Sequence, residues 1–215
     1  MNMSTAVLLV LAGYLAGSIP FGYWLVRLLR GEDVRRYGSG NIGGTNVWRC
    51  FGARYGLAVV LFDVLKGFIP ALIASLTQGS LVAVLTGAAA MLGHWRPLFM
   101  RFRRGGKMVA TCGGAAIGIA PLVAVVGAVV WALVFLVGRY ASLASMLAAV
   151  SLAPAALLLG QDLPVVIFMG AAAPAIIWLH RANIGRLARG EELRFQLWHG
   201  RWRKAVGRRS QARTR

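Results

Sequence analysis

The chain has 215 residues, of which 58% are hydrophobic and only 14% are charged, and its mean hydropathy is +0.67. A soluble domain would carry about 25% charged residues. Apolar runs of roughly 20 residues recur along the chain, and each is long enough to cross a bilayer core of about 30 Å. These features exclude an ordinary soluble domain and predict a single-domain, all-α, polytopic integral membrane protein.

The charge balance is strongly basic, because 24 Lys and Arg residues against 6 Asp and Glu residues give a net charge of +18. In a soluble chain this value would indicate a nucleic-acid partner. Here the basic residues flank the apolar runs, so we expect no nucleic acid, but attraction to lipid headgroups and to anionic substrates. The two cysteines, Cys50 and Cys112, fit neither a disulfide framework nor a zinc site, and we expect no metal and no cofactor.

Seven membrane-spanning helices are predicted. The first apolar run has no basic segment before it and continues past Leu25, which favours a spanning helix over a cleaved signal peptide. The run that starts at Met108 is long for one helix and short for two, and glycines cluster before Pro121, so we divide it there. The expected spans, in chain order, are residues 5–29, 56–77, 81–100, 108–120, 122–138, 142–159 and 163–179.

The connections between these spans predict the orientation. The connections at 78–80, near Pro121 and at 160–162 contain no Lys or Arg. We therefore expect them outside with the N-terminus, whereas the basic loops, Arg139 and the C-terminus lie in the cytoplasm. Six spans would put the Arg-rich tail on the wrong side of the membrane.

Two charged residues, Asp63 and Lys66, fall in the middle of the second span. They are three residues apart, so they share a helix face and are expected to neutralise each other inside the bundle. Two interpretations stay open. The residues form a structural ion pair, or one of them supports a nearby functional site from inside the membrane.

The first of three polar islands is the glycine-rich stretch from Gly38 to Arg49. Its glycines allow close backbone approach to a ligand, its short polar side chains add donors, and its arginine suits an anion. This is the equipment of a phosphate cradle, with a flexible loop as the alternative. The candidate residues are Ser39, Asn41, Thr45, Asn46 and Arg49.

The other two islands carry similar chemistry. Gly105, Gly106 and Lys107 precede a predicted helix, where backbone N–H groups and the helix dipole favour an anion, although the spacing is not that of a P-loop. In the third island, His180 and Asn183 share a face if the segment is helical. A plain helix entry and an interfacial histidine are the structural alternatives. Ser142 and Ser145, after Arg139, add hydroxyls at a fourth boundary.

These islands together resemble the bacterial acyl-phosphate:glycerol-3-phosphate acyltransferases, an integral-membrane family that makes lysophosphatidic acid. The resemblance covers nearly the whole chain. The matching residues are Gly38–Asn46 with Arg49; Gly93-His94, Pro97, Phe102, Gly105-Gly106-Lys107 and Val109-Ala110-Thr111; Arg139-Tyr140, Ser142 and Ser145; Asp63-Val64-Leu65-Lys66-Gly67; and His180, Asn183, Ile184, Arg186, Leu187, Gly190 and Glu192.

The chain departs from the family pattern at four places. Arg103-Arg104 adds one residue before Gly105, and Met108 replaces the last glycine of the second motif. Leu179 stands where the family has arginine, and Glu191 where threonine is usual. The shape of the second loop is the feature that these changes affect most.

The resemblance implies acyl transfer from acyl phosphate to glycerol 3-phosphate, as the first acylation step of phospholipid biosynthesis. It implies a cytoplasm-facing site in the bacterial inner membrane and a possible partner in the soluble enzyme that makes acyl phosphate. The implied roles are phosphate binding by Ser39, Arg49, Gly105, Gly106 and Lys107, with Ser142 and Ser145 donating to the same oxygens; orientation of the acceptor by His180 and Asn183; and anchoring of the third loop to an arginine by Glu192.

Because an acyl phosphate is already activated, no covalent enzyme nucleophile is required. The leaving phosphate is expected to take the hydroxyl proton, with His180 as the rival base. A transporter or flippase for phosphorylated metabolites or lipids is the alternative function, but polarity concentrated at one surface favours an enzyme.

Overall fold

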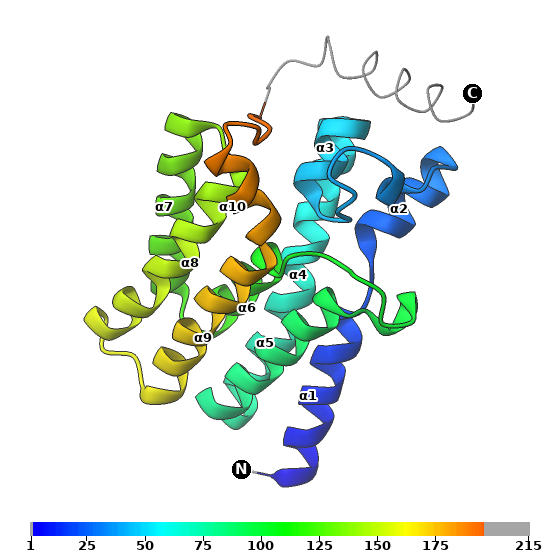
Figure 1. The fold of residues 1–215 in the computed structure, drawn as a ribbon. Coiled ribbons are helices and arrows are strands. Elements are labelled where there is room, and N and C mark those ends of the chain that lie inside the picture. The colour runs from blue at the N-terminus through cyan, green and yellow to red at the C-terminus, as the bar shows by residue number, and fades with distance from the viewer. Residues whose placement is uncertain (1, 196–215) are drawn as a thin grey trace, which may run out of the picture.

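The computed structural model describes residues 2–195, which form helices and no strand (Figure 1). The all-α prediction is therefore confirmed for the described part of the chain. The helices are α1 Met3–Gly17, α2 Phe21–Arg30, α3 Gly44–Phe51, α4 Ala53–Gln78, α5 Ser80–Trp95, α6 Val109–Ile119, α7 Pro121–Gly138, α8 Ala141–Leu158, α9 Leu163–Leu179 and α10 Arg181–Ala188. Two short 3-10 turns cover Val34–Arg36 and Leu98–Met100.

Several of these elements are long and apolar enough to cross a membrane. By length and composition the described residues contain 4 candidate spans, at Met3–Arg30 (α1 and α2 taken together), Ala53–Gln78, Pro121–Gly138 and Ala141–Leu158. Helices α9 and α10, bent by 60° at their junction, make a fifth if they are counted together. The expected span at 108–120 is present as the 11-residue helix α6, whose rise of about 16 Å falls well short of a bilayer core.

The first expected span, residues 5–29, is not one continuous helix. It is interrupted between α1 and α2 at Ser18, Ile19 and Pro20. Proline has no N–H for the helix ladder, and it disfavours helical geometry in the residue before it. The apolar composition of this run concealed the break. The Ile19 carbonyl there accepts the Phe21 N–H over 3.1 Å and can accept a second donor from another helix.

The expected division at Pro121 is confirmed. Helix α6 ends at Ile119, and α7 begins at Pro121, the first helical position, where proline loses no hydrogen bond. Ile119 packs against a cluster formed by Ala6, Ala74, Val82 and Ala83. The turn therefore lies toward the end of the bundle where α4 ends and α5 begins.

The connections that lack Lys and Arg gather at this same end of the bundle. The Asn2 N–H donates to Gln78 Oε1 over 3.0 Å, and the Ser80 hydroxyl donates to the Asp162 carboxylate. At the opposite end, the Phe195 N–H donates to the Arg139 carbonyl over 2.7 Å. The fold thus separates an end without basic loops from an end that carries them.

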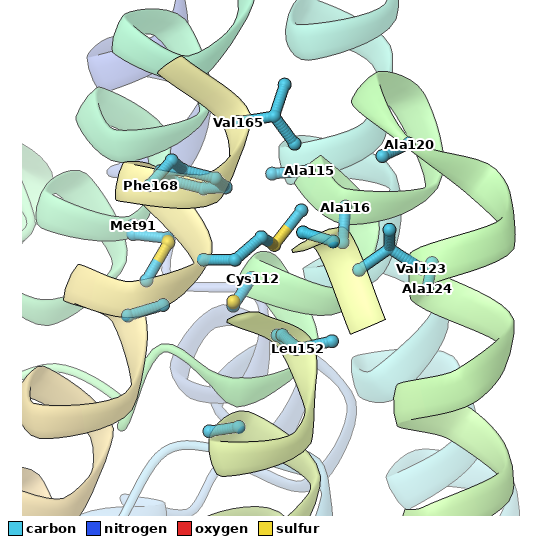
Figure 2. Close-up of a cluster of buried hydrophobic side chains, with 14 of the residues drawn as sticks. Met91, Cys112, Ala115, Ala116, Ala120, Val123, Ala124, Leu152, Val165 and Phe168 are labelled. Carbon is cyan, nitrogen blue, oxygen red and sulfur yellow. The ribbon is translucent and has the colours of Figure 1, made fainter. Parts of the chain in front are cut away.

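Small residues let the helices approach closely. A Cβ on Gly114 of α6 would collide with the Val64 carbonyl of α4, and one on Gly67 of α4 would collide with the Thr111 carbonyl of α6. Such contacts are typical of helix packing inside membranes, where small residues bring backbones together. Figure 2 shows the neighbouring core, in which Met91, Cys112, Leu152 and Phe168 converge from α5, α6, α8 and α9.

The outward faces of the helices are apolar as well. Leu8 is 66% exposed, Leu76 77% and Val137 90%. Large apolar side chains exposed in such number indicate a membrane or an interface rather than a water-facing surface. The bundle therefore presents a lipid-compatible exterior.

Candidate active site

A buried hydrogen-bond network joins the second and third polar islands to the start of α8. Lys107 Nζ donates to Asn183 Oδ1 over 2.6 Å, and Asn183 Nδ2 donates to Glu192 Oε1, also over 2.6 Å. Ser142 Oγ donates to the same Glu192 oxygen over 2.7 Å, and Arg186 Nε donates to Glu192 Oε2 over 2.7 Å. Glu192 thus ties the loop before α6, the start of α8 and α10 to one carboxylate.

The network carries more positive than negative charge. Burial lowers the pKa of Lys107 to about 8; the Glu192 charge opposes this shift, and Arg186, Arg104 and Arg49 add to it. Burial also lowers the pKa of Arg49. Burial alone would raise the pKa of Glu192, but hydrogen bonds from Ser142, Asn183 and Arg186 lower it overall. Three cations therefore face one ionised carboxylate, which is an environment that favours an added anion.

His180 lies at the bend between α9 and α10 and is 3% exposed. Its Nδ1 lies 2.8 Å from the Ile176 carbonyl. A carbonyl can only accept, so Nδ1 carries the hydrogen and the neutral ring keeps Nε2 as an acceptor. The Asn183 N–H donates to the His180 carbonyl over 2.7 Å, which fixes the two residues relative to each other.

In the first island, two asparagines organise the loop itself. Asn46 Oδ1 accepts from the Ser39 N–H over 2.9 Å, and its Nδ2 donates to the carbonyls of Tyr37 and Asn41. Asn41 Oδ1 accepts from the Gly43 N–H over 2.7 Å. These side chains, which we expected to bind substrate, hold the loop in shape. Thr45 lies partly buried in the first turn of α3.

Arg49 connects this loop to the network. Its Nη2 donates to the Leu193 carbonyl over 2.8 Å, one residue beyond Glu192, and its buried Nε has no hydrogen-bond partner among the described residues. The guanidinium lies 5.8 Å from the Phe195 ring centre. An unpaired buried donor is costly, so Arg49 retains capacity for another acceptor.

The two glycines of the second island do not offer their amides to a ligand. The Gly105 N–H donates to the Trp95 carbonyl over 2.8 Å, and the Gly106 N–H to the His94 carbonyl over 2.9 Å. The last carbonyls of a helix have no N–H partner within the helix. This loop supplies two N–H donors to the last carbonyls of α5. Gly105 and Gly106 therefore seat the loop on α5, and Lys107, the next residue, extends its side chain to Asn183.

Met108 adopts the backbone shape that a glycine would favour. Its φ is +69°, in the left-handed region, and its side chain is 4% exposed in the core. Arg101 and Phe102, just before the extra residue at Arg103-Arg104, also have positive φ. Left-handed geometry costs a non-glycine residue roughly 1–2 kcal/mol, which burial of the Met108 side chain offsets.

The structure separates the two serines of α8. Ser142 belongs to the network, whereas Ser145 Oγ donates to the Ala141 carbonyl over 2.6 Å and accepts from Trp131 Nε1 over 3.2 Å. Ser145 therefore helps to pack α7 against α8, and its hydroxyl hydrogen is used in the bond to Ala141. The Ser39 hydroxyl has only a long contact, 3.5 Å from the Asn41 amide, and so keeps its donor.

Sequence reasoning missed two contributors to this site. Arg186, noted only as part of a motif, is the arginine that anchors Glu192. His94, also noted only within a motif, lies against Gly106, where an added Cβ would collide with its ring. The Gly93-His94 pair at the end of an apolar span was the available signal. Within residues 2–195, no group of three His, Cys, Asp or Glu side chains could hold a metal ion.

Comparisons with known proteins show the family of this chain. The family described as glycerol-3-phosphate acyltransferase matches residues 7–190. The glycerol-3-phosphate acyltransferase of Desulforamulus reducens is 42% identical over 191 residues, which cover 88% of this chain and 95% of the relative. That of Aquifex aeolicus is 45% identical over 192 residues, which cover 88% and 99%.

Two solved structures have the same fold. Both are crystal structures of PlsY (YgiH), an integral membrane glycerol 3-phosphate acyltransferase. Its glycerol 3-phosphate form matches with a TM-score of 0.86 and 44% identity, over 89% of this chain and 96% of that chain. Its lysophosphatidic acid form matches with a TM-score of 0.83 and 42% identity, over 91% and 97%. This chain belongs to the glycerol-3-phosphate acyltransferase family of integral membrane proteins.

Proposed function

We propose that this chain transfers a fatty acyl group from acyl phosphate to glycerol 3-phosphate, giving 1-acylglycerol 3-phosphate and inorganic phosphate. The observation that carries the proposal is the network in which Lys107 meets Asn183, with Arg49 and Arg186 close enough to act on its charge. Both substrates are anions, which suits a site of three cations and one carboxylate. The similar PlsY protein has been solved in forms with the acceptor and with the product.

The reaction needs positioning and charge stabilisation more than a nucleophilic side chain. The primary hydroxyl oxygen of glycerol 3-phosphate attacks the acyl carbonyl carbon, and the bond from that carbon to the phosphate oxygen breaks. The hydroxyl proton leaves with the phosphate. Lys107, Arg49 and the Ser39 hydroxyl hold phosphate oxygens in this scheme, and they stabilise the charge that develops on the leaving group.

His180 and Asn183 orient the acceptor. His180 Nε2 accepts a hydrogen bond from the hydroxyl group of glycerol 3-phosphate. The Asn183 amide, which is held between Lys107 and Glu192, fixes the direction from which this hydroxyl approaches. The same Nε2 could instead take the proton, which is the rival role. Both roles use one nitrogen, so kinetics must separate them.

We infer seven crossings of the inner membrane, with the N-terminus outside and the site facing the cytoplasm. The connections at 78–80, near Pro121 and at 160–162 lie at one end of the bundle and contain no Lys or Arg. The cationic network lies at the other end, as the positive-inside rule requires. In this arrangement α6 and the loop before it together make one crossing. A soluble enzyme that makes acyl phosphate would reach the site from the cytoplasm.

The decisive experiment uses the purified full-length chain, labelled glycerol 3-phosphate, and acyl phosphate or acyl-CoA in turn. We expect labelled lysophosphatidic acid and an equal amount of phosphate from acyl phosphate alone, because the described residues include no large polar domain to bind coenzyme A. Equal turnover with acyl-CoA would refute the donor assignment. Uptake of label into vesicles without acylation would instead support the transporter alternative.

A further inference from the structure

Three buried polar side chains outside the network remain unexplained by the proposed reaction. Asp63 and Lys66 lie on α4 and His94 on α5, with side-chain exposures of 4%, 2% and 4%. Lys66 Nζ lies 2.7 Å from Asp63 Oδ1, which confirms the expected ion pair. Charged groups inside a membrane bundle are costly, and the ones that persist usually serve a purpose.

Lys66, on one side of this group, contacts the break between α1 and α2. Lys66 Nζ donates to the Ile19 carbonyl over 3.0 Å, and this carbonyl belongs to the interruption between α1 and α2. The ammonium also lies 5.8 Å from the centre of the Phe21 ring. Lys66 therefore compensates a backbone group that the proline break leaves outside a regular helix.

The other side of the group meets the loop that carries Lys107. His94 Nδ1 lies 3.7 Å from Asp63 Oδ1. This is too long for a hydrogen bond, but it places the ring and the carboxylate side by side inside the bundle. The opposite ring nitrogen, Nε2, faces Gly106, where an added Cβ would collide with it. The His94 carbonyl also accepts the Gly106 N–H over 2.9 Å.

Gly106 therefore rests on both the backbone and the ring of His94, and Lys107 is the next residue. A seat that fixes Gly106 also fixes the start of the lysine side chain, whose Nζ reaches Asn183. Displacement of a catalytic group by about 1 Å can reduce a rate by about 10²-fold. The position of Gly106 on His94 thus affects where the Lys107 ammonium lies in the site.

We propose that Asp63, Lys66 and His94 form a positioning unit that sets the place of the Lys107 ammonium through Gly106. The unit contacts no substrate. It links the α1–α2 break, α4 and α5 to the loop before α6. Buried groups thereby fix the position of this loop relative to the helices. This inference rests on the proposed role of Lys107 in binding a phosphate.

The test is a double-mutant cycle between His94→Ala and Lys107→Ala, with labelled glycerol 3-phosphate and acyl phosphate. In the wild-type background we expect His94→Ala to raise the KM for glycerol 3-phosphate by about 10-fold. In the Lys107→Ala background the same change should have little further effect, because residues that act through one group are not additive. A general folding defect would lower kcat through the active fraction and leave KM unchanged.

Thr86→Val is the matched control. Thr86 is also on α5, is fully buried, and its hydroxyl has no partner among the described residues. It lies about two turns before His94 and packs against Gly13 of α1. We expect its KM and kcat to stay within about two-fold of wild type, as for independent sites. An Asp63→Asn/Lys66→Met variant, which removes both charges together, should behave like His94→Ala.

Equilibrium dialysis with labelled glycerol 3-phosphate measures the same coupling without turnover. Weaker binding in His94→Ala, with no further loss on top of Lys107→Ala, supports the positioning unit. Unchanged binding, or an equal loss in both backgrounds, overturns it. Wild-type protein that binds glycerol 3-phosphate but does not acylate it would count against the proposed function alone.

Discussion

Lys107 Nζ lies 2.6 Å from Asn183 Oδ1 and so joins the loop before α6 to α10 across 76 residues of sequence. Asn183 Nδ2 in turn donates a hydrogen bond to Glu192. Arg186 of the same segment forms an ion pair with this carboxylate. A single amide therefore stands between the cation that we assign to phosphate and the carboxylate that balances it.

Loss of the Lys107 charge should cost activity strongly. We expect Lys107→Ala to lower kcat/KM by about 10²-fold or more, the range found when one charge-stabilising donor is removed. Arg189→Ala is the control, since Arg189 and its partner Glu191 are 61% and 56% exposed and such surface pairs contribute little. Steady-state acylation by membranes with matched protein levels measures both. If the control loses as much as Lys107→Ala, the site is misplaced.

The acylation rate should fall as pH rises above about 8, well below the pH at which an ordinary lysine loses its charge. Because burial lowers the pKa of Lys107 from 10.5 to about 8, the ammonium is present below pH 8 and is lost as pH rises through that value. The pH profile of kcat/KM for glycerol 3-phosphate should show this limb. Lys107→Arg should move the limb upward, since a guanidinium stays protonated. An unchanged limb in Lys107→Arg would assign it to another group.

Glu192→Gln should weaken the fold around the site. The amide cannot satisfy Arg186, Asn183 and Ser142 together as the carboxylate does, and each buried donor left without a partner costs about 1–3 kcal/mol. We expect a lower thermal midpoint in detergent as well as lower activity. Because the folded-state pKa of Glu192 is lowered, its contribution is present at neutral pH and is lost on acidification through that lowered value. A midpoint equal to wild type at pH 7 would contradict this role.

Met108 offers a test of backbone shape. Its positive φ is strongly disfavoured for a β-branched residue, so Met108→Val should destabilise more than Met108→Gly, although valine keeps an apolar side chain. Met108→Gly relieves the backbone but loses buried surface worth about 1.5–3 kcal/mol. Thermal unfolding of both variants gives the order. A valine variant more stable than the glycine variant would show that this loop has another conformation.

The sequence predicted the elements more readily than their contacts. The division at Pro121, the Asp63–Lys66 pair and the polar islands follow from proline chemistry, helical spacing and charge. The break at Pro20 was missed because an unbroken apolar run outweighed one proline. The pairing of Ser142 with Glu192, 50 residues apart, and the return of the Gly105 and Gly106 amides to α5 depend on the path of the loops. No local pattern encodes that path.

The role of His180 can be resolved by a conservative change. Its Nδ1 faces the Ile176 carbonyl, so the reacting nitrogen in either role is Nε2. If the leaving phosphate takes the proton, His180→Gln, which still offers an acceptor, should mainly raise the KM for glycerol 3-phosphate and keep most of kcat. If His180 is the base, kcat should fall by about 10²–10⁴-fold, because an amide cannot take up the proton. Single-turnover measurements with saturating glycerol 3-phosphate separate the two, since they report the chemical step without product release. We expect the smaller effect on kcat, and a loss of 10²-fold or more in the chemical step would assign the base to His180.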